Sequence, residues 1–342
     1  MSIGFDAGTY NLVCCSRKDK KDDKDADFEY EREINAFLEL PLENKFLFNI
    51  MKSNNVPLIK KENVAYVLGE SAVNMAYTIS QLELKRPMIH GCVNPREKSA
   101  FEIMSTMIHS LIENSVKKNG EVLYYSVPAN AINEDTDADY HQRILDAIFK
   151  AYESSKGFKI EAYPINEALA LVYAELASKA FTGIGISCGA GMVNICYAMY
   201  GNPIFSFSIV NSGDWIDKQA AKATGETIAF INKEKMKIDL SKQPNTLVER
   251  AIHTQYRLMI EHTVDGIKKG FSEITKTVRT DAPVDIVIAG GTSSPYGFAT
   301  LFKEAIQKVE LPIKIGEIIK PNDPLRSVAR GCLVAAEAAA AS

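Results

Sequence analysis

A chain of 342 residues is long enough for two ordinary domains, and 46% hydrophobic with 24% charged residues is typical of a globular protein that buries its own cores. The formal net charge of -4 and the pI near 5.9 give no electrostatic reason to expect nucleic acid as the main partner. The six cysteines form no CxxC pair and lie near no histidine at zinc-finger spacing, so reduced cytosolic thiols are expected.

The N-terminus enters a predicted strand directly, without the basic segment and apolar core of a signal peptide. No apolar run reaches the ~20 residues that span a bilayer, so a cytoplasmic protein is expected. Scattered histidines give no pattern for a metal or acid–base site: His90, His109, His141, His253 and His262.

The first half of the chain alternates predicted strands and helices, which favours a sheet covered by helices. Residues 2–17 are predicted to form two strands joined by a Gly-Thr turn. The mixed-charge run 17–33 is predicted to be a solvated loop or hairpin tip. A strand, a glycine turn and a helix start are expected over 63–76, and a helix over 95–118. Strand, helix, strand and helix then follow over residues 120–130, 138–155, 158–165 and 166–180.

The second half of the chain again combines predicted strands and helices. Residues 181–213 are predicted to form a meander of three strands joined by glycine turns. Long helical patterns are expected from 215 to 278, followed by strand, helix, strand and helix over residues 284–291, 296–309, 311–319 and 323–341. The apolar segment 33–51 fits either the first core or a surface that contacts another subunit.

Two stretches look like copies of one another. The same pattern occurs in "IGFDAGTYNLVCC" and "IGISCGAGMVNICYA". In each, a first strand ends in apolar, polar and small residues and a glycine, and a second strand follows, which indicates an internal duplication. Two such hairpins facing each other present backbone N–H groups to a polyphosphate, because glycines let the main chain approach it closely. A carboxylate at the strand end would hold Mg²⁺ through water, a role that Asp6 fits and Ser187 does not.

Five stretches in order resemble the superfamily of actin, seventy-kilodalton heat-shock chaperone and sugar-kinase ATPases. "FDAGT" and "ISCGAGMVN" resemble its two phosphate motifs, "INEALAL" and "DPLRSVARGC" its two connecting helices, and "IAGGTSS" its adenosine motif. Within the superfamily, "VLGESA", "RPMIHGCV", "KEKMKIDL" and "SGDWID" are most similar to the bacterial actins, namely the MreB group and its magnetosome relative.

This resemblance implies an α/β, actin-like fold of two duplicated RNase H-like domains around a central nucleotide cleft. The implied domains are residues 1–165 plus 325–342, which carry the first phosphate hairpin, and residues 166–324, which carry the second hairpin and the adenosine motif. Implied cofactors are ATP or ADP and Mg²⁺.

The resemblance also implies the roles of individual residues. Asp6 and Glu167 are the expected catalytic residues, with Asp6 serving the metal and Glu167 orienting the attacking water. The expected nucleotide-binding residues are Gly8, Thr9, Tyr10, Asn11, Ser187, Gly189, Ala190, Gly191, Gly213, Asp214, Glu234, Lys237, Gly290, Gly291, Thr292 and Ser293.

Simpler interpretations stand beside three of these residues. Glu167 also suits a helix N-terminus, where the helix dipole favours an acid. Glu234 and Lys237, three residues apart on one helical face, also suit an exposed ion pair.

The second phosphate motif departs from the superfamily, which usually carries Asp at Ser187 and Thr at Met192. Serine brings no charge to a hydrated metal ion and methionine brings no strong hydrogen-bonding group. Nucleotide binding is therefore expected to be better preserved than hydrolysis, because phosphoryl transfer depends on placement and charge. Alternatively, Asp214 supplies the missing charge.

The expected function is an actin-like ATP-binding protein that assembles into nucleotide-dependent filaments, with itself as partner. A non-polymerising, chaperone-like or regulatory ATPase is the alternative, although the chain shows no β-rich substrate domain after the ATPase core. A small-molecule kinase ranks last because no residue is assignable as its base. No amphipathic N-terminal helix resembles a membrane anchor, and adaptor proteins are not predicted.

Overall fold

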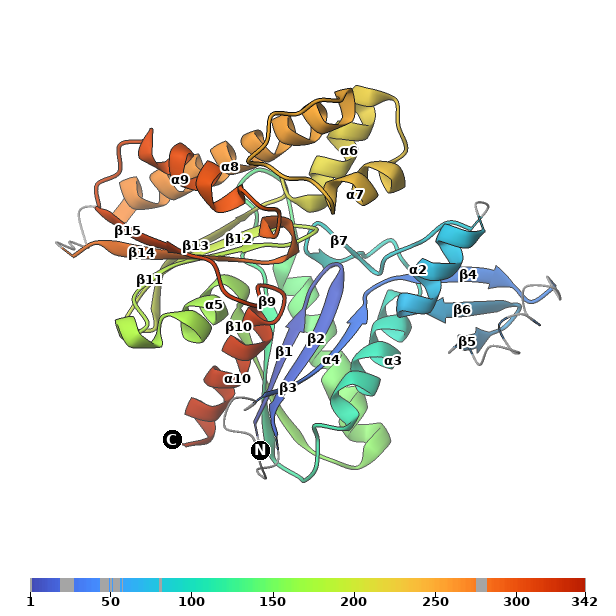
Figure 1. The fold of residues 1–342 in the computed structure, drawn as a ribbon. Helices are drawn as coiled ribbons and strands as arrows, with labels where there is room; N and C mark the ends of the chain where they lie inside the picture. The colour runs from blue at the N-terminus through green and yellow to red at the C-terminus, as the bar shows by residue number, and fades with distance from the viewer. Residues whose placement is uncertain are drawn as a thin grey trace.

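Two five-stranded sheets form the centre of the molecule, each flanked by helices (Figure 1). The computed structural model describes residues 2–18, 28–43, 49, 51, 56, 58–79, 82–274 and 282–341.

The first sheet has the strand order β10-β9-β1-β2-β3. Strand β1 (Ser2–Ala7) pairs antiparallel with β2 (Asn11–Arg17), which pairs antiparallel with β3 (Phe28–Ile34). On its other side β1 runs parallel to β9 (Glu121–Val127), which runs parallel to β10 (Ile160–Asn166). Strand β1 is therefore central, and its C-terminal end opens towards the second sheet.

The second sheet, β13-β12-β11-β14-β15, repeats this arrangement of directions. Strand β11 (Gly183–Cys188) pairs antiparallel with β12 (Val193–Met199), which pairs antiparallel with β13 (Asn202–Ile209). On the other side lie the parallel strands β14 (Val284–Ala289) and β15 (Ile315–Ile319). The duplication predicted from the two glycine-containing hairpins is confirmed.

Helices cover both sheets and lie between them (Figure 1). The first sheet is covered by α3 (Ala100–Glu113) and α4 (Ala138–Lys156), with Ile3, Phe5 and Phe149 in their shared core. Four helices belong to the second half: α6 (Gly213–Thr224), α7 (Ile228–Lys235), α8 (Leu247–Ile274) and α9 (Phe298–Gln307). Between the sheets, α5 (Glu167–Glu175) and α10 (Ser327–Ala340) pack against each other.

Smaller elements complete the fold. A three-stranded sheet joins β4 (Phe37–Pro41), β6 (Val64–Leu68) and β5 (Leu58–Lys61), and α2 (Gly69–Thr78) packs against it. The remaining short elements are β7 (Met88–Ile89), β8 (Cys92–Val93) and the 3-10 turns Ala177–Lys179 and Gly291–Ser293.

Glycines allow the inner helices to approach the two central strands. A Cβ atom on Gly4 of β1 would overlap the backbone of Ala329 in α10. In the second half, a Cβ atom on Gly185 of β11 would overlap the carbonyl oxygen of Ala168 in α5. The two glycines precede Asp6 and Ser187 by two residues, so an equivalent contact, with α10 in the first half and with α5 in the second, lies just before each strand end.

Several predicted elements need correction. Residues 28–33 are not a solvated loop but belong to β3, because Phe28 and Tyr30 pack towards α10 while Glu29 points outward. Residues 19–27 lie outside the described residues. The helix expected over 95–118 is only α3, and the pattern from 215 to 278 divides into α6, α7 and α8.

Most of the described apolar residues of segment 33–51 contribute to the core. Leu38 and Leu40 of β4 and Met51 are buried in one cluster with Val67 and Ala72. Of the two interpretations offered by the sequence, the described residues therefore favour the core.

Replacing Gly331 with alanine tests the crossing of α5 and α10. Alanine would normally favour a helix by ~1 kcal/mol, but its Cβ would overlap the carbonyl oxygen of Ala170. Overpacking outweighs propensity, so we expect Gly331→Ala to lower the free energy of unfolding by at least about 2 kcal/mol in urea denaturation. Ala339→Val, on the exposed end of α10, should change it by less than about 0.5 kcal/mol. Equal stability of the two variants would contradict a tight crossing.

Candidate functional site

A buried carboxyl group marks the end of the first central strand. Asp6 Oδ1 accepts a hydrogen bond from Ser126 Oγ of β9 at 2.8 Å, and the same hydroxyl accepts one from the Ala7 N–H at 2.9 Å. A neutral hydroxyl does not neutralise a carboxylate, and burial raises the pKa of Asp6 to about 6. Asp6 is thus fixed in place but short of compensating charge.

Ser187 occupies the equivalent place in β11 and contacts a second carboxyl group. Its Oγ donates to Glu167 Oε1 at 2.5 Å, and Asn194 Nδ2 of the paired strand β12 donates to Oε2 at 2.9 Å. Ser208 in turn donates to Asn194 Oδ1. A serine therefore suits this strand end because an aspartate would face Glu167 directly.

The two carboxyl groups influence each other across the two halves. Burial first, and then the negative charge of Asp6, raise the pKa of Glu167 to about 8. Asp6 lies near the end of β1, whereas Glu167 opens α5 and is hydrogen-bonded to Ser187 near the end of β11. At neutral pH, with no cation nearby, Glu167 carries its proton.

This donor set fits a hydrated magnesium ion. Mg²⁺ keeps most of its waters and takes one or two carboxylates together with phosphate oxygens, whereas a closed protein cage needs more ligands. Across the described ranges no group of three or more His, Cys, Asp or Glu side chains could hold a metal. Asp6, with its uncompensated buried charge, is the residue that a hydrated cation would stabilise.

The two glycine-containing turns lie in contact. A Cβ atom on Gly191 would come within 2.5 Å of Thr9 Oγ1, so the second turn approaches the first through bare backbone. Beside Thr9, Asn11 Oδ1 is buried and has no hydrogen-bond partner among the described residues.

The second turn is joined to the start of α6 and to the adenosine motif. Gly189 O accepts hydrogen bonds from Ser212 Oγ at 2.5 Å, Thr292 Oγ1 at 2.7 Å and the Gly213 N–H at 3.3 Å. Gly290, at φ 91°, lies against the backbone of Cys188 at the end of β11, where no Cβ would fit.

The rest of the adenosine motif lies in the same place. Ser293 Oγ donates to Gly290 O at 2.8 Å within the 3-10 turn that begins at Gly291. Three stretches that are distant in sequence, around Gly189, Gly213 and Thr292, are thereby assembled.

Glu234 and Lys237 pair with each other at 3.1 Å, with 36% and 62% of their side chains exposed. This is the geometry of the simpler interpretation, and their contact with a nucleotide stays a prediction. The neighbouring Lys235, which the sequence did not single out, is buried and donates to Gly213 O at 2.8 Å while pairing with Asp217 at 2.8 Å. Lys235 therefore ties α7 to the start of α6.

Met192 has a packing role. Its side chain is buried, and a Cβ atom on Gly91 in the β7–β8 turn would lie 2.5 Å from its Sδ atom. The residue that replaces threonine in the second turn therefore packs against the first half of the chain.

Asp214 is engaged by a residue that sequence reasoning did not assign. Both carboxylate oxygens lie 2.9 Å from guanidinium nitrogens of Arg86, and the Asp214 N–H donates to Ala190 O at 2.8 Å. The guanidinium also lies 5.9 Å from the centre of the Tyr10 ring. Asp214 thus meets an arginine, which weakens its alternative role as the missing metal ligand.

Five site residues were missed: Ser126, Asn194, Ser212, Lys235 and Arg86. The first two offered a signal, since each is a polar residue between apolar or aromatic neighbours in its strand. The other three become visible only through contacts between distant segments.

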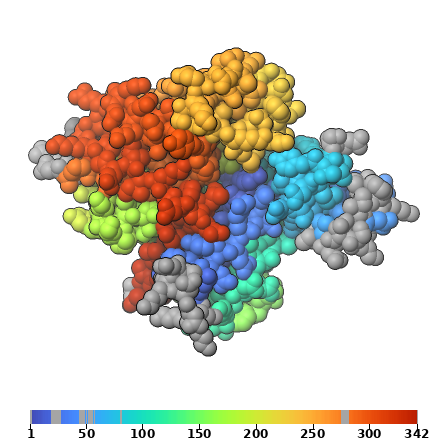
Figure 2. All heavy atoms as spheres, in the orientation of Figure 1, coloured from blue at the N-terminus to red at the C-terminus, as the bar shows by residue number. Residues whose placement is uncertain are grey.

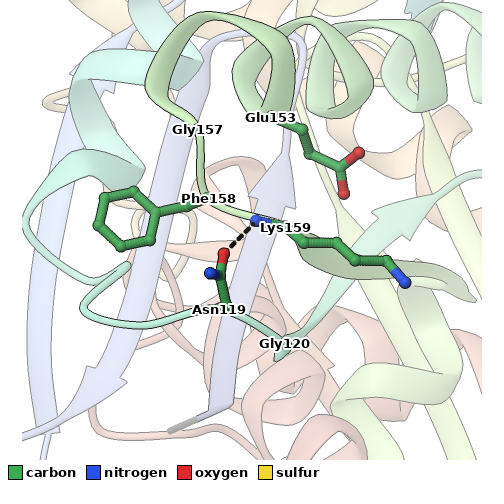
Figure 3. A pocket seen from close by; sticks show the side chains of 6 residues that line it. All are labelled: Asn119, Gly120, Glu153, Gly157, Phe158 and Lys159. Carbon is green, nitrogen blue, oxygen red and sulfur yellow. Dashed lines mark hydrogen bonds between the residues drawn. The ribbon is translucent and has the colours of Figure 1, made fainter.

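A surface hollow of about 530 Å³ lies at the other end of the first sheet, where β9 and β10 begin. Asn119 Oδ1 accepts from the Lys159 N–H at 2.8 Å there (Figure 3). None of the predicted site residues lines it; its lining is Asn119, Gly120, Glu153, Gly157, Phe158 and Lys159.

The model of the Volactin family matches residues 1–336, so the chain belongs to this family. No curated protein matches it significantly.

Solved structures of bacterial actins resemble the whole chain. The MamK double helical filament has a TM-score of 0.69 at 16% identity, covering 98% of each chain. MreB 5 of Spiroplasma citri bound to AMPPNP has a TM-score of 0.66 at 14% identity, covering 99% of this chain and 96% of that one. The ADP-bound form of MreB5 has a TM-score of 0.63 at 13% identity, covering 96% and 94%. The fold is therefore actin-like, as predicted.

The raised pKa of Glu167 predicts a pH-dependent stability. The folded protein keeps this proton between the ordinary value of 4.5 and about 8, whereas the unfolded chain releases it, so the free energy of unfolding should fall as pH rises through that range. Urea denaturation of Glu167→Gln should show a flatter pH profile. The exposed control Glu310→Gln should keep the wild-type slope. A wild-type slope in Glu167→Gln would show that this carboxyl group does not titrate in that window.

Proposed function

We propose that this chain binds ATP and ADP with Mg²⁺ between its two sheets, hydrolyses ATP slowly and assembles into nucleotide-dependent filaments. The observation that carries the proposal is the meeting of two equivalent strand-end turns, with Asp6 and Glu167 beside them. Two solved bacterial-actin structures of this fold are described as bound to ADP or AMPPNP, which supports the choice of nucleotide.

Backbone groups would form most of the phosphate contacts. Gly8, Thr9 and the segment 189–191 present main chain without bulky side chains, which suits close approach of phosphate oxygens. Gly213 and the segment 290–293 lie directly beyond the second turn, where the nucleoside would extend. Glu234 and Lys237 are proposed for the outer edge of that pocket.

Asp6 would hold the hydrated metal ion, which supplies positive charge to the phosphates when bound. Glu167 would orient the attacking water. Its hydrogen bonds from Ser187 and Asn194 fix its position, but a carboxyl group that retains its own proton is a poor acceptor for a proton from water. We expect slow hydrolysis for this reason, and also because Asp6 is the one strand-end carboxylate proposed to hold the cation.

Movement of two lobes around the nucleotide would link binding to assembly. The proposed lobes are residues 1–165 plus 325–342 and residues 166–324. Contacts of α10 with β1 and β9, and of α5 with β11 and β12, support this division.

Self-assembly is favoured over a non-polymerising regulatory ATPase because the MamK structure of this fold is itself a double helical filament. We propose a cytoplasmic, cytoskeletal protein without a direct membrane anchor or nucleic-acid partner. In the described part of the chain, no helix has the length and apolar character needed to cross a membrane.

Calorimetric titration tests nucleotide binding. Wild type should bind one ATP or ADP per chain, more tightly with Mg²⁺. Asp6→Asn should bind nucleotide about tenfold more weakly, which corresponds to ~1.4 kcal/mol, and Mg²⁺ should no longer tighten its binding. The exposed control Asp265→Asn should bind like wild type. Absence of ATP and ADP binding by folded wild-type protein would refute the proposed site.

Ser187→Asp tests the account of slow hydrolysis. The new carboxylate would face Glu167, so the variant should be less stable than wild type without Mg²⁺ and should regain stability when MgATP is added. Phosphate release should be faster than in wild type, because a second strand-end carboxylate would position the cation. A variant no faster than wild type would contradict this explanation.

Sedimentation tests assembly. Wild type should pellet with ATP and Mg²⁺ and show filaments by negative-stain microscopy, whereas Asp6→Asn should pellet less. Soluble protein under every nucleotide condition would favour the regulatory ATPase instead.

A further inference from the structure

Arg86 and Asp214 form an ion pair between the two halves of the molecule, which we call the cleft latch. Arg86 Nη2 donates a charge-assisted hydrogen bond to Asp214 Oδ1 at 2.9 Å, and Arg86 Nη1 lies 2.9 Å from Asp214 Oδ2. The side chains are 30% and 19% exposed, which places the pair near the surface. Figure 2 shows the surfaces of α6–α7 (yellow to gold) and of the segment around α2 (cyan) meeting on this side of the molecule.

Each partner is firmly attached to its own half. The residue before Arg86 is Lys85, whose backbone exchanges two hydrogen bonds of 2.9 Å with Phe37 of β4 and whose Nζ pairs with Glu39 at 2.6 Å. Asp214 lies in the first turn of α6, and its N–H donates to Ala190 O in the second phosphate turn. Neither half can move away from the other without separating the pair.

The latch also touches both phosphate turns. Tyr10, which follows Thr9 in the first turn, has its ring centre 5.9 Å from the Arg86 guanidinium, and Ala190 belongs to the second turn. The pair therefore lies beside both turns between which the nucleotide is proposed to bind.

We infer that the Arg86–Asp214 pair is a latch that keeps the two halves closed and sets the rate at which a bound nucleotide is released. The release part of this inference rests on the proposed nucleotide site. The closure part does not depend on a ligand.

Closure is measured without nucleotide by the distance between two spin labels. Asn74→Cys on α2 and Lys222→Cys on α6 are exposed positions in opposite halves, and the six native cysteines are buried, so labels should attach to the introduced thiols. The otherwise wild-type protein should give one narrow distance distribution. Arg86→Ala should lengthen and broaden it.

Two further variants make this result specific. Lys85→Ala, which removes a cation paired within the first half, should keep the wild-type distribution. The charge exchange Arg86→Asp with Asp214→Arg should restore the narrow distribution that each single substitution loses. An unchanged distance in Arg86→Ala, or failure of the exchange to restore it, would overturn the inference.

Release is measured by chasing a fluorescent ADP analogue with excess ADP. Arg86→Ala should release it about three- to tenfold faster than wild type, as expected for loss of a partly exposed, charge-assisted ion pair. Raising NaCl to 1 M should accelerate release from wild type more than from Arg86→Ala, because salt screens the ion pair only where it is present. Equal release rates in both proteins would refute the part of the inference that concerns release. If wild type binds no nucleotide at all, the proposed function is refuted, and the spin-label distances alone then test whether the pair keeps the two halves closed.

Discussion

The close contact of two helices with two central strands determines the geometry of this molecule. The backbone of α10 lies so close to Gly4, and that of α5 so close to Gly185, that a side chain at either glycine would overlap it. Gly331 of α10 is in equally close contact with the backbone of α5. Because the two strand glycines stand just before Asp6 and Ser187, this packing also fixes where both strands end. Backbone contact in the core is therefore the origin of the candidate site.

The cost of this arrangement is electrostatic. Asp6 and Glu167 are buried near each other, and their hydrogen bonds from Ser126, Ser187 and Asn194 bring no positive charge. Proteins usually leave such a pair protonated or supply a cation. The raised pKa values of both groups reflect this lack of compensating charge, which the proposed cation would supply.

Much of the fold follows from sequence pattern, because the two hairpins and the apolar parallel strands carry local signals of turn and burial. The hairpin strands and the parallel strands were predictable in this way, but β3 was not, since charged residues alternate with the side chains of its inner face, Phe28, Tyr30 and Ile34. The missed site contacts join distant residues: Ser126 to Asp6 over 120 positions and Arg86 to Asp214 over 128. No local periodicity reports such pairs, because the first forms only when β1 and β9 pair and the second only when the two halves come together.

Amide hydrogen exchange with and without MgATP tests the central claim most directly, because it observes both turns in one experiment. If phosphates are bound between the strand ends, segments 7–11 and 188–192 should become protected together, while the distant hollow around Asn119 and Lys159 keeps its exchange rate. Protection of only one turn, or of neither, would contradict a shared phosphate site.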